Sequence, residues 1–173
     1  GTDNMGRDIF SQLLFGARTS LVIGLVAAGI SGVLCTMLGG ISGYFGGVVD
    51  RIMVEFINIF VMTPSFFLIL IIVSLFGSDI RYVMLVIGLT SWPGNARLMR
   101  AQAISLRERT FVKSAISMGE SKPSILFRHI IPNGIFPIIA NTTLQVSGAI
   151  LTESGLSFLG LGDPNIVSWG KMI

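Results

Sequence analysis

The chain has 173 residues, of which 51% are hydrophobic and only 12% are charged, and its mean hydropathy is +0.79. Soluble domains carry about 25% charged residues, so the composition excludes a soluble globular protein and indicates an integral membrane protein. Cys35 is the single cysteine and lies in an apolar stretch. Neither a disulfide nor a cysteine metal cluster can therefore form within the chain. Because the chain begins at Gly1 instead of a methionine and stops abruptly at Ile173, we expect a fragment of a longer protein.

The first half of the chain contains two long apolar runs. Residues 21–44 exceed the roughly 20 residues that cross a bilayer as a helix. Residues 56–78 form a second run, which Pro64 interrupts. Proline lacks the amide donor that a helix interior needs, so we expect the second span to be kinked or divided there.

Two further apolar runs follow. Residues 82–96 are few for a span and suffice only if Arg97 and Arg100 extend their charged ends to the interface. Residues 130–152 form the fourth run, with Pro132 and Pro137 near its start, where a missing donor costs little. The sequence therefore predicts an all-α, polytopic transmembrane helical bundle, with 1–173 forming one transmembrane domain.

Small residues recur every fourth position along the first run and share one drifting stripe of that helix. In lipid, small side chains let helix backbones approach one another. The stripe therefore predicts close packing of the first span against a neighbour. It consists of Gly24, Ala28, Gly32, Thr36 and Gly40.

Seven of the twelve basic residues lie in one segment, residues 97 to about 131. Loops rich in lysine and arginine remain in the cytoplasm, so we expect this loop to be cytoplasmic and both ends of the chain to be external. Arg7 and Arg18 then fall on the outer side, where Asp3 and Asp8 offset their charge. The seven residues are Arg97, Arg100, Arg107, Arg109, Lys113, Lys122 and Arg128.

The basic loop is patterned as two short helices. Ser105 and Glu108 have the spacing of a capping box, and residues 111, 115 and 118 then share one helical face, formed by Phe111, Ala115 and Met118. Gly119 is suited to end this helix with a left-handed residue. We expect a glycine hinge at this position.

A second short helix is predicted over residues 122–131. Ser121 can cap it, Pro123 is tolerated in its first turn, and it continues into the fourth span at Pro132. Such a segment could also be an amphipathic hairpin whose basic side chains lie on anionic lipid headgroups. Both interpretations remain open on composition alone.

The loop resembles the signature loop of the permease subunits of ABC importers. That pattern reads Glu-Ala-Ala, three residues, Gly, nine residues, Ile, any residue, Leu-Pro. Ala115, Gly119 and Pro132 match it in kind and spacing. The departures are Lys113 for the glutamate, Ser114 for the first alanine, His129 for isoleucine and Ile131 for leucine.

The flanking segments resemble one branch of this family, the second permease of dipeptide, oligopeptide and nickel importers. The similar motifs are Gly1-Thr2-Asp3, Gly6-Arg7-Asp8, the run from Leu156 to Gly162, and Ser168-Trp169-Gly170. The resemblance covers nearly the whole chain. It implies a subunit with about six spans, of which this fragment contains about four, one span being absent before Gly1 and one after Ile173.

The resemblance implies a pore-forming permease of the cell (inner) membrane that moves peptides, nickel or oligosaccharides by alternating access. It implies a second, homologous permease subunit, two cytoplasmic ATP-binding subunits and an extracytoplasmic substrate-binding protein as partners. The loop, about 97–131, would bind an ATPase subunit and transmit its closure to the spans. The implied coupling residues are Lys113, Ser114, Ala115, Gly119, Glu120, Ser121, Lys122, Pro123, Arg128 and Pro132.

The remaining polar residues favour structural roles. Glu153 at the end of the fourth span can pack a gate or contact substrate. The three charged residues at the inner end of the second span read as interface anchors, with an inter-subunit contact as the alternative; they are Asp50, Arg51 and Glu55. His129 has no second histidine to form a metal site and is assigned to the polar face of the second short helix.

No phosphate-binding loop and no pairing of a nucleophile with a base occurs in the sequence. We therefore expect no enzyme, no cofactor in this chain, no nucleic-acid partner, and ATP hydrolysis in partner subunits. A secondary transporter or channel subunit is the alternative function, but that class predicts charge buried within the spans, which the apolar runs lack. Neither the cargo nor the substrate-binding residues can be identified from the sequence.

Overall fold

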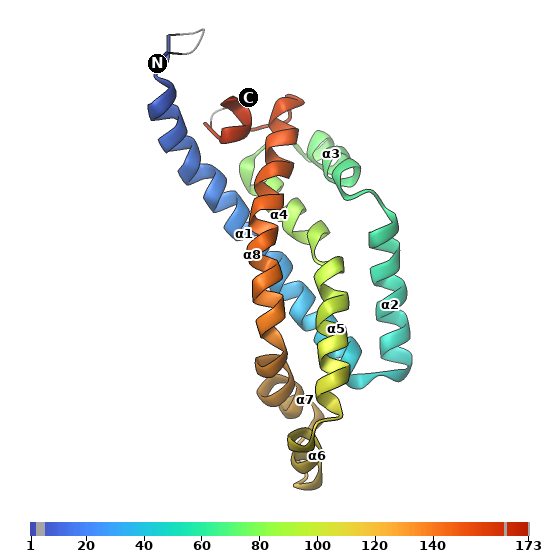
Figure 1. Ribbon diagram of the computed structural model, residues 1–173. Coiled ribbons are helices and arrows are strands. Elements are labelled where there is room, and N and C mark those ends of the chain that lie inside the picture. Colours follow the sequence, from blue (N-terminus) through green and yellow to red (C-terminus); the bar gives the residue numbers. More distant parts are fainter. Residues whose placement is uncertain (3–5, 165, 173) are drawn as a thin grey trace. The chain divides into compact units, whose positions relative to one another are not determined.

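The computed structural model describes residues 1–2, 6–164 and 166–172, and Asp3 therefore lies outside the described residues. The described residues form helices, with no β-strand among them, which confirms the all-α prediction (Figure 1). They divide into two compact units, each described by itself below. Unit 1 comprises Gly1–Ile30, Phe66–Leu89 and Leu144–Ile173, and unit 2 comprises Ser31–Ser65 and Thr90–Thr143.

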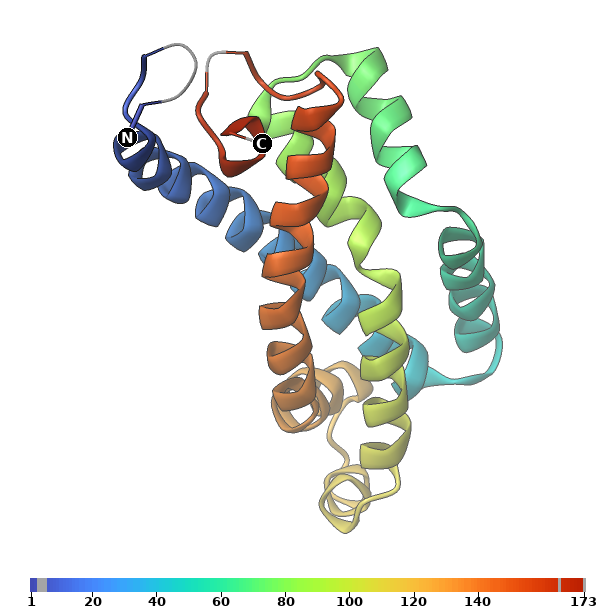
Figure 2. The same ribbon diagram turned by 45° about the horizontal axis from the view of Figure 1, so that its top comes forward.

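Helix α1, Ile9–Phe45, is one unbroken helix of 37 residues in both ribbon views (Figures 1 and 2). It includes the predicted span, residues 21–44, and starts twelve residues earlier. At 1.5 Å per residue it is about 55 Å long, whereas the apolar bilayer interior measures about 30 Å. Part of α1 therefore extends beyond the lipid tails.

The predicted break at Pro64 is confirmed. Helix α2, Gly47–Met62, ends just before it and helix α3, Ser65–Phe76, begins just after it. Helix α2 starts earlier than the sequence predicts, at two glycines with positive φ: Gly46 (66°) is its N-cap residue and Gly47 (57°) is its first residue. Asp50, Arg51 and Glu55 consequently lie inside α2 and do not flank a helix that starts at 56.

The predicted third span, residues 82–96, is wrong. Helix α4, Ile80–Ser91, ends before Trp92, and a separate helix, α5, runs from Pro93 to Arg107. Pro93 fits the first turn of α5, but it has no amide hydrogen with which to continue the hydrogen bonds of α4. Among the described residues, two helices are long and apolar enough to span a membrane, or three if α2 and α3 form one broken span, and α4 is a shorter apolar helix.

Five helical segments follow α5 among the described residues. Helix α6 covers Thr110–Ser117 and helix α7 covers Lys122–Ile125, and a π-helical stretch, Leu126–Ile130, joins α7 to helix α8, Ile131–Phe158. Pro137 lies inside α8, one and a half turns from its start, and not in the first turn. A short 3₁₀ helix, Trp169–Met172, follows α8.

The core of unit 2 forms where α1 meets α5. A Cβ atom added at Gly39 would collide with the carbonyl oxygen of Ala96, and one added at Gly43 with that of Arg100. The predicted stripe makes a looser contact here, since a Cβ at Gly32 would lie 3.2 Å from the Thr142 side chain. Close packing of α1 is therefore correct, but its tightest point is a pair of glycines that the stripe omits.

An ion pair between Asp50 and Arg100 joins α2 to α5. The Arg100 guanidinium donates to both carboxylate oxygens of Asp50, at 2.6 and 2.7 Å. The Ser42 hydroxyl of α1 donates to Asp50 at 2.5 Å. Bidentate arginine–carboxylate pairs are stronger than single charge contacts, so Asp50 joins three helices and is more than an interface anchor.

Unit 1 packs α1 against α4 and the second half of α8. A Cβ at Gly24 would lie 2.8 Å from the Val146 side chain, and one at Gly88 would lie 2.8 Å from Cβ of Ile30. Glu153 of α8 is buried, and one of its carboxylate oxygens accepts from Ser157 at 2.7 Å and Ser168 at 2.8 Å. Helix α8 continues past the predicted end of the fourth run, so the ionisable residue Glu153 is buried within it.

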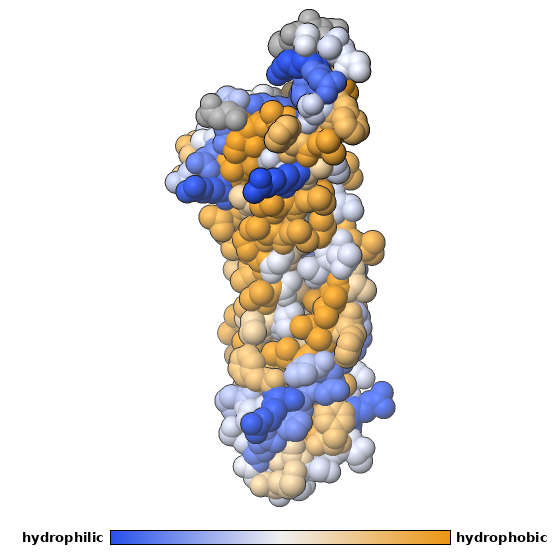
Figure 3. All heavy atoms as spheres, turned by 90° about the vertical axis from the view of Figure 1, so that its left-hand side faces the viewer, coloured by the Kyte–Doolittle hydropathy of each residue, from blue (hydrophilic) through white to orange (hydrophobic). Residues whose placement is uncertain are grey.

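The surface is strongly apolar, because hydrophobic side chains, orange in Figure 3, cover much of the face in view. In unit 1, Phe15, Leu75 and Leu151 are each more than 70% exposed. Side chains of this kind would be unfavourable in water but are stable against lipid tails or partner helices. The surface therefore agrees with the membrane class that the composition indicates.

The contact between α1 and α5 generates a prediction with an internal control. Gly43→Ala would place a methyl group against the Arg100 carbonyl, whereas Gly29→Ala on the same helix meets no atom within 4 Å. Both changes raise helix propensity equally, by about 1 kcal/mol, while overpacking costs about 1–3 kcal/mol. We expect Gly43→Ala to lower the thermal unfolding temperature in detergent, and Gly29→Ala to leave it unchanged or raise it. Equal unfolding temperatures would contradict the close contact.

Candidate functional site

The basic segment is mostly helix. Helix α5 continues through Arg97 and Arg100 to Arg107, so the predicted loop of residues 97–131 begins about ten residues too early. The capping box is also wrong: Ser105 lies inside α5, and the N-cap of α6 is Arg109, whose side chain makes no capping bond. Residues 97–107 are mainly good helix formers, which allows α5 to pass the serine without a break.

Gly119 forms the turn between α6 and α7, as the sequence predicts. Its φ is +81°, and no atom lies within 4 Å of where a Cβ would be. Its amide donates to the carbonyl of Ile116 at 3.0 Å, and the amide of Glu120 donates to that of Ala115 at 3.1 Å. These two bonds form the Schellman motif that ends helices at a left-handed residue, so glycine is required for its backbone angle and not for space.

The start of α7 also follows the prediction. Ser121 is the N-cap residue, although its side chain forms no capping bond, and Pro123 lies in the first turn. Helix α7 then continues through the π-helical stretch into α8, so that Lys122–Phe158 is one run of 37 helical residues. The sequence predicts this continuity through Pro132, but it contains no sign of the π-helical geometry.

A cluster of three polar side chains, which the sequence does not predict, lies beside the turn at Gly119. Its members are Glu120, Ser124 and His129. Ser124 donates to one carboxylate oxygen of Glu120 at 2.6 Å, and the Nε2 atom of His129 lies 2.8 Å from the other. The hydrogen bond from Ser124, followed by that from His129, lowers the pKa of Glu120 below its ordinary value. Both oxygens of the residue after Gly119 are thereby bound to the helix that follows. The spacing of 120 and 124 is a helical signal, whereas nothing in the sequence pairs 120 with 129.

We call residues 110–130 the α6–α7 segment, and it packs on the end of α5. Its buried side chains share one hydrophobic core with Met99 and Ala103 of α5. They are Val112, Ala115, Ile125, Leu126 and Ile130. Of the predicted face of Phe111, Ala115 and Met118, only Ala115 is buried, because α6 begins at Thr110 and turns Val112 inward in their place.

The outer surface of the α6–α7 segment combines apolar and basic side chains. Met118 is 79% exposed, and Ile116 and Phe127 are each 52% exposed. Lys113 lies 3.3 Å from Glu108, but both side chains are more than half exposed, and such pairs contribute little to stability. Ser114, Ser121, Lys122, Pro123, Arg128 and Pro132 are exposed as well. A surface of this kind is suited to a protein partner with apolar and acidic side chains.

Glu153 is not part of the α6–α7 segment. It lies in unit 1, whereas the whole α6–α7 segment lies in unit 2. The hydrogen bond that Ser168 donates to Glu153 holds the end of α8 to the segment that follows it, and Ser157 donates to the same oxygen from within α8. This arrangement favours a structural role over direct contact with substrate.

Comparison with known proteins agrees with these features. Residues 35–172 match the family described as the inner membrane component of binding-protein-dependent transport systems. The chain is 41% identical, over its full length, to the oligopeptide transport system permease protein OppC of Haemophilus influenzae, of which it covers 56%.

Two further relatives show the same pattern. The dipeptide transport system permease protein DppC of Alkalihalophilus pseudofirmus is 38% identical over the full chain, which covers 57% of that protein. The glutathione transport system permease protein GsiD of Pectobacterium atrosepticum is 36% identical, with 58% covered. The chain thus spans little more than half the length of these relatives. It belongs to the family of inner membrane components of binding-protein-dependent transport systems.

Proposed function

We propose that this chain is the larger part of a permease subunit that forms half of the transport path of an ATP-driven peptide importer. Its relatives are named for oligopeptide, dipeptide and glutathione transport, which favours peptides over the nickel or oligosaccharide that the sequence motifs also allow. The proposed partners are a second permease subunit, two ATP-binding subunits and an external substrate-binding protein. These partners would supply both the ATP hydrolysis and the delivery of substrate.

The observation that carries this proposal is the continuity of α7 with α8. A protein that binds α7 holds one end of a run of 37 helical residues, of which α8 is the apolar part. A displacement of α7 is therefore transmitted to α8 without an intervening loop. The left-handed turn at Gly119 lets α7 change direction relative to α6, and the bonds from Ser124 and His129 to Glu120 limit that change. Such a segment can couple the closure of an ATPase dimer to rearrangement of the spans.

The proposed orientation places the α6–α7 segment in the cytoplasm, because its basic side chains obey the positive-inside rule. Lys113 is solvent-exposed in the position where the signature loop has glutamate. We propose that an acidic residue on the ATPase subunit faces it. The competing interpretation, a hairpin lying on lipid headgroups, requires the exposed charges but neither the Schellman turn nor the polar cluster at Glu120.

The hinge can be tested with two substitutions of similar size and opposite backbone preference. Nothing surrounds the missing Cβ of Gly119, so Gly119→Asn and Gly119→Val both fit in space. Asparagine tolerates a positive φ, whereas a β-branched residue rarely adopts it and pays about 1–2 kcal/mol or more. We expect Gly119→Val to lose most transport and most of the ATPase stimulation by loaded binding protein, at unchanged membrane levels, and Gly119→Asn to retain both. The two are measured in reconstituted vesicles. If valine and asparagine behave alike, the left-handed turn is not needed for coupling.

The polar cluster predicts a dependence on pH. Because the folded-state pKa of Glu120 lies below its ordinary value of 4.5, its carboxylate stabilises the folded segment fully above that value, and the stabilisation is lost as the pH falls through the folded-state pKa. We expect hydrogen exchange of the amides of residues 121–130 to be slower in the parent than in Glu120→Gln at pH 7. The difference should vanish in acid, after correction for intrinsic exchange rates. A difference that persists unchanged in acid would mean that Glu120 ionisation does not brace α7.

A further inference from the structure

Unit 1 contains a cavity between α1, α4 and the segment after α8. Helices α1 and α4 pack tightly where Gly88 meets Ala27 and Ile30. Nearer the amino-terminal ends of both helices lies an open cavity of about 500 Å³, a size typical of ligand sites. Its lining comprises Phe15, Arg18, Thr19 and Val22 of α1, Ile80 and Met84 of α4, and Ile166 and Val167 after α8.

The lining of this cavity is apolar apart from two adjacent donors. The Arg18 guanidinium is exposed and, within the described part of the chain, has neither an ion pair nor a hydrogen bond, and the same is true of the Thr19 hydroxyl. No aspartate or glutamate lines the cavity. An arginine with a neighbouring hydroxyl suits a phosphate group, which the guanidinium can bind with two parallel hydrogen bonds.

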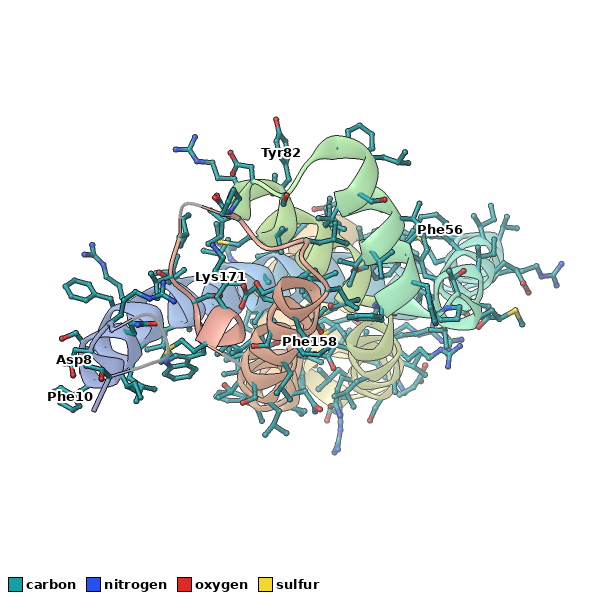
Figure 4. The ribbon with its side chains drawn as sticks, turned by 90° about the horizontal axis from the view of Figure 1, so that it is seen from above. Asp8, Phe10, Phe56, Tyr82, Phe158 and Lys171 are labelled. Atoms are coloured by element: carbon teal, nitrogen blue, oxygen red, sulfur yellow. The ribbon has the colours of Figure 1, made fainter. Side chains whose placement is uncertain are left out.

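The position of Arg18 along α1 matches the headgroup level of a bilayer. It precedes the apolar run of residues 21–44 by three residues. Aromatic side chains that favour the membrane interface occur close by. The Trp169 indole donates to the carbonyl of Leu13 at 3.1 Å, and Tyr82 of α4, labelled in Figure 4, is 52% exposed. The charged end of the cavity therefore lies among headgroups, while Val22 is already part of the apolar run.

A second cavity supports the same charge preference. It measures about 270 Å³, shares Ile166 and Val167 with the first, and is lined by Arg7 and Lys171 but by no acidic side chain. Lys171, labelled in Figure 4, donates to the Asp163 carbonyl at 2.6 Å. Each cavity therefore has a cationic side chain in its lining and no acidic one.

We propose that the cavity beside Arg18 binds the phosphate of an anionic phospholipid, in the leaflet that contains the amino-terminal end of α1. Arg18 and Thr19 would hold the phosphate, and an acyl chain would lie along Val22 and Met84, on the side of the apolar run. A zwitterionic lipid offers the same phosphate but adds an amine, which finds no carboxylate in the lining. The site therefore selects lipids with net negative charge. This proposal does not depend on transport or on the ATPase partners.

The test uses the full-length complex, purified in detergent, with Arg18→Gln, the conservative Arg18→Lys, and Arg51→Gln as a control. Arg51 is also exposed, has no ion pair among the described residues, and lies on α2 outside this cavity. Thermal unfolding is followed during titration with phosphatidylglycerol, phosphatidylcholine or inorganic phosphate. Retained lipid is identified by native mass spectrometry.

Phosphatidylglycerol should raise the unfolding temperature of the parent and of Arg51→Gln, with bound lipid detected in both. Arg18→Gln should weaken the apparent affinity about tenfold, the usual effect of losing one charge-assisted bond, and Arg18→Lys should lie between. Equal affinity in Arg18→Gln would overturn the site. Equal stabilisation by phosphatidylcholine would overturn the charge preference, and equal stabilisation by inorganic phosphate would show a free-anion site with no lipid selectivity.

Discussion

The backbone of α1 touches the backbone of α5 at Gly39 and Gly43, and the geometry of unit 2 depends on this contact. Lipid tails are as apolar as leucine, so helices in a membrane associate by close packing and hydrogen bonds more than by hydrophobic force. The missing side chains allow the carbonyl oxygens of Ala96 and Arg100 to approach α1 directly. Arg100 is then in position to bind Asp50 of α2.

Helix α5 in turn carries the α6–α7 segment. Its residues Met99 and Ala103 share a hydrophobic core with Val112, Ile125 and Leu126. The packing of α5 therefore fixes the positions of α6 and α7. The left-handed turn at Gly119 is the one point in this segment where the chain changes direction without a long loop. The segment thus packs firmly on α5, and its hydrogen-bonded turn at Gly119 leads into a long helix. A segment that transmits motion to a span needs both features.

The sequence predicts the features that single residues impose. Pro64 divides a helix and Gly119 adopts a left-handed turn because no neighbour can change what those residues favour. The apolar composition sets the class, and the loop motif leads to the correct family. The predicted helix boundaries are wrong where one residue is compatible with two different structures. Pro93 starts a helix that apolar counting runs through, and Ser105 sits within a helix that a capping motif would end there.

The sequence does not predict contacts between residues that are far apart along the chain. The pairing of Asp50 with Arg100 joins positions 50 residues apart, and that of Glu120 with His129 spans a π-helical stretch. The pair Gly39 and Gly43 is visible as a small-residue motif, but only the structure distinguishes it from the overlapping stripe of Gly24, Gly32 and Gly40. Glu153 likewise is charged in the sequence and buried in the fold, because Ser157 and Ser168 bind its carboxylate.

The central claim, that the α6–α7 segment is the contact with an ATPase subunit, is tested most directly by cross-linking in the assembled complex. Met118→Cys places a thiol at a position that is 79% exposed, while the native Cys35 is buried. Leu144→Cys in α8, at a position 73% exposed, is the matched control. A photoactivatable thiol reagent on Met118→Cys should cross-link to the ATP-binding subunit, with a yield that changes when ATP is added, and Leu144→Cys should not. Cross-links from Met118→Cys only to lipid or to the external binding protein would contradict the account.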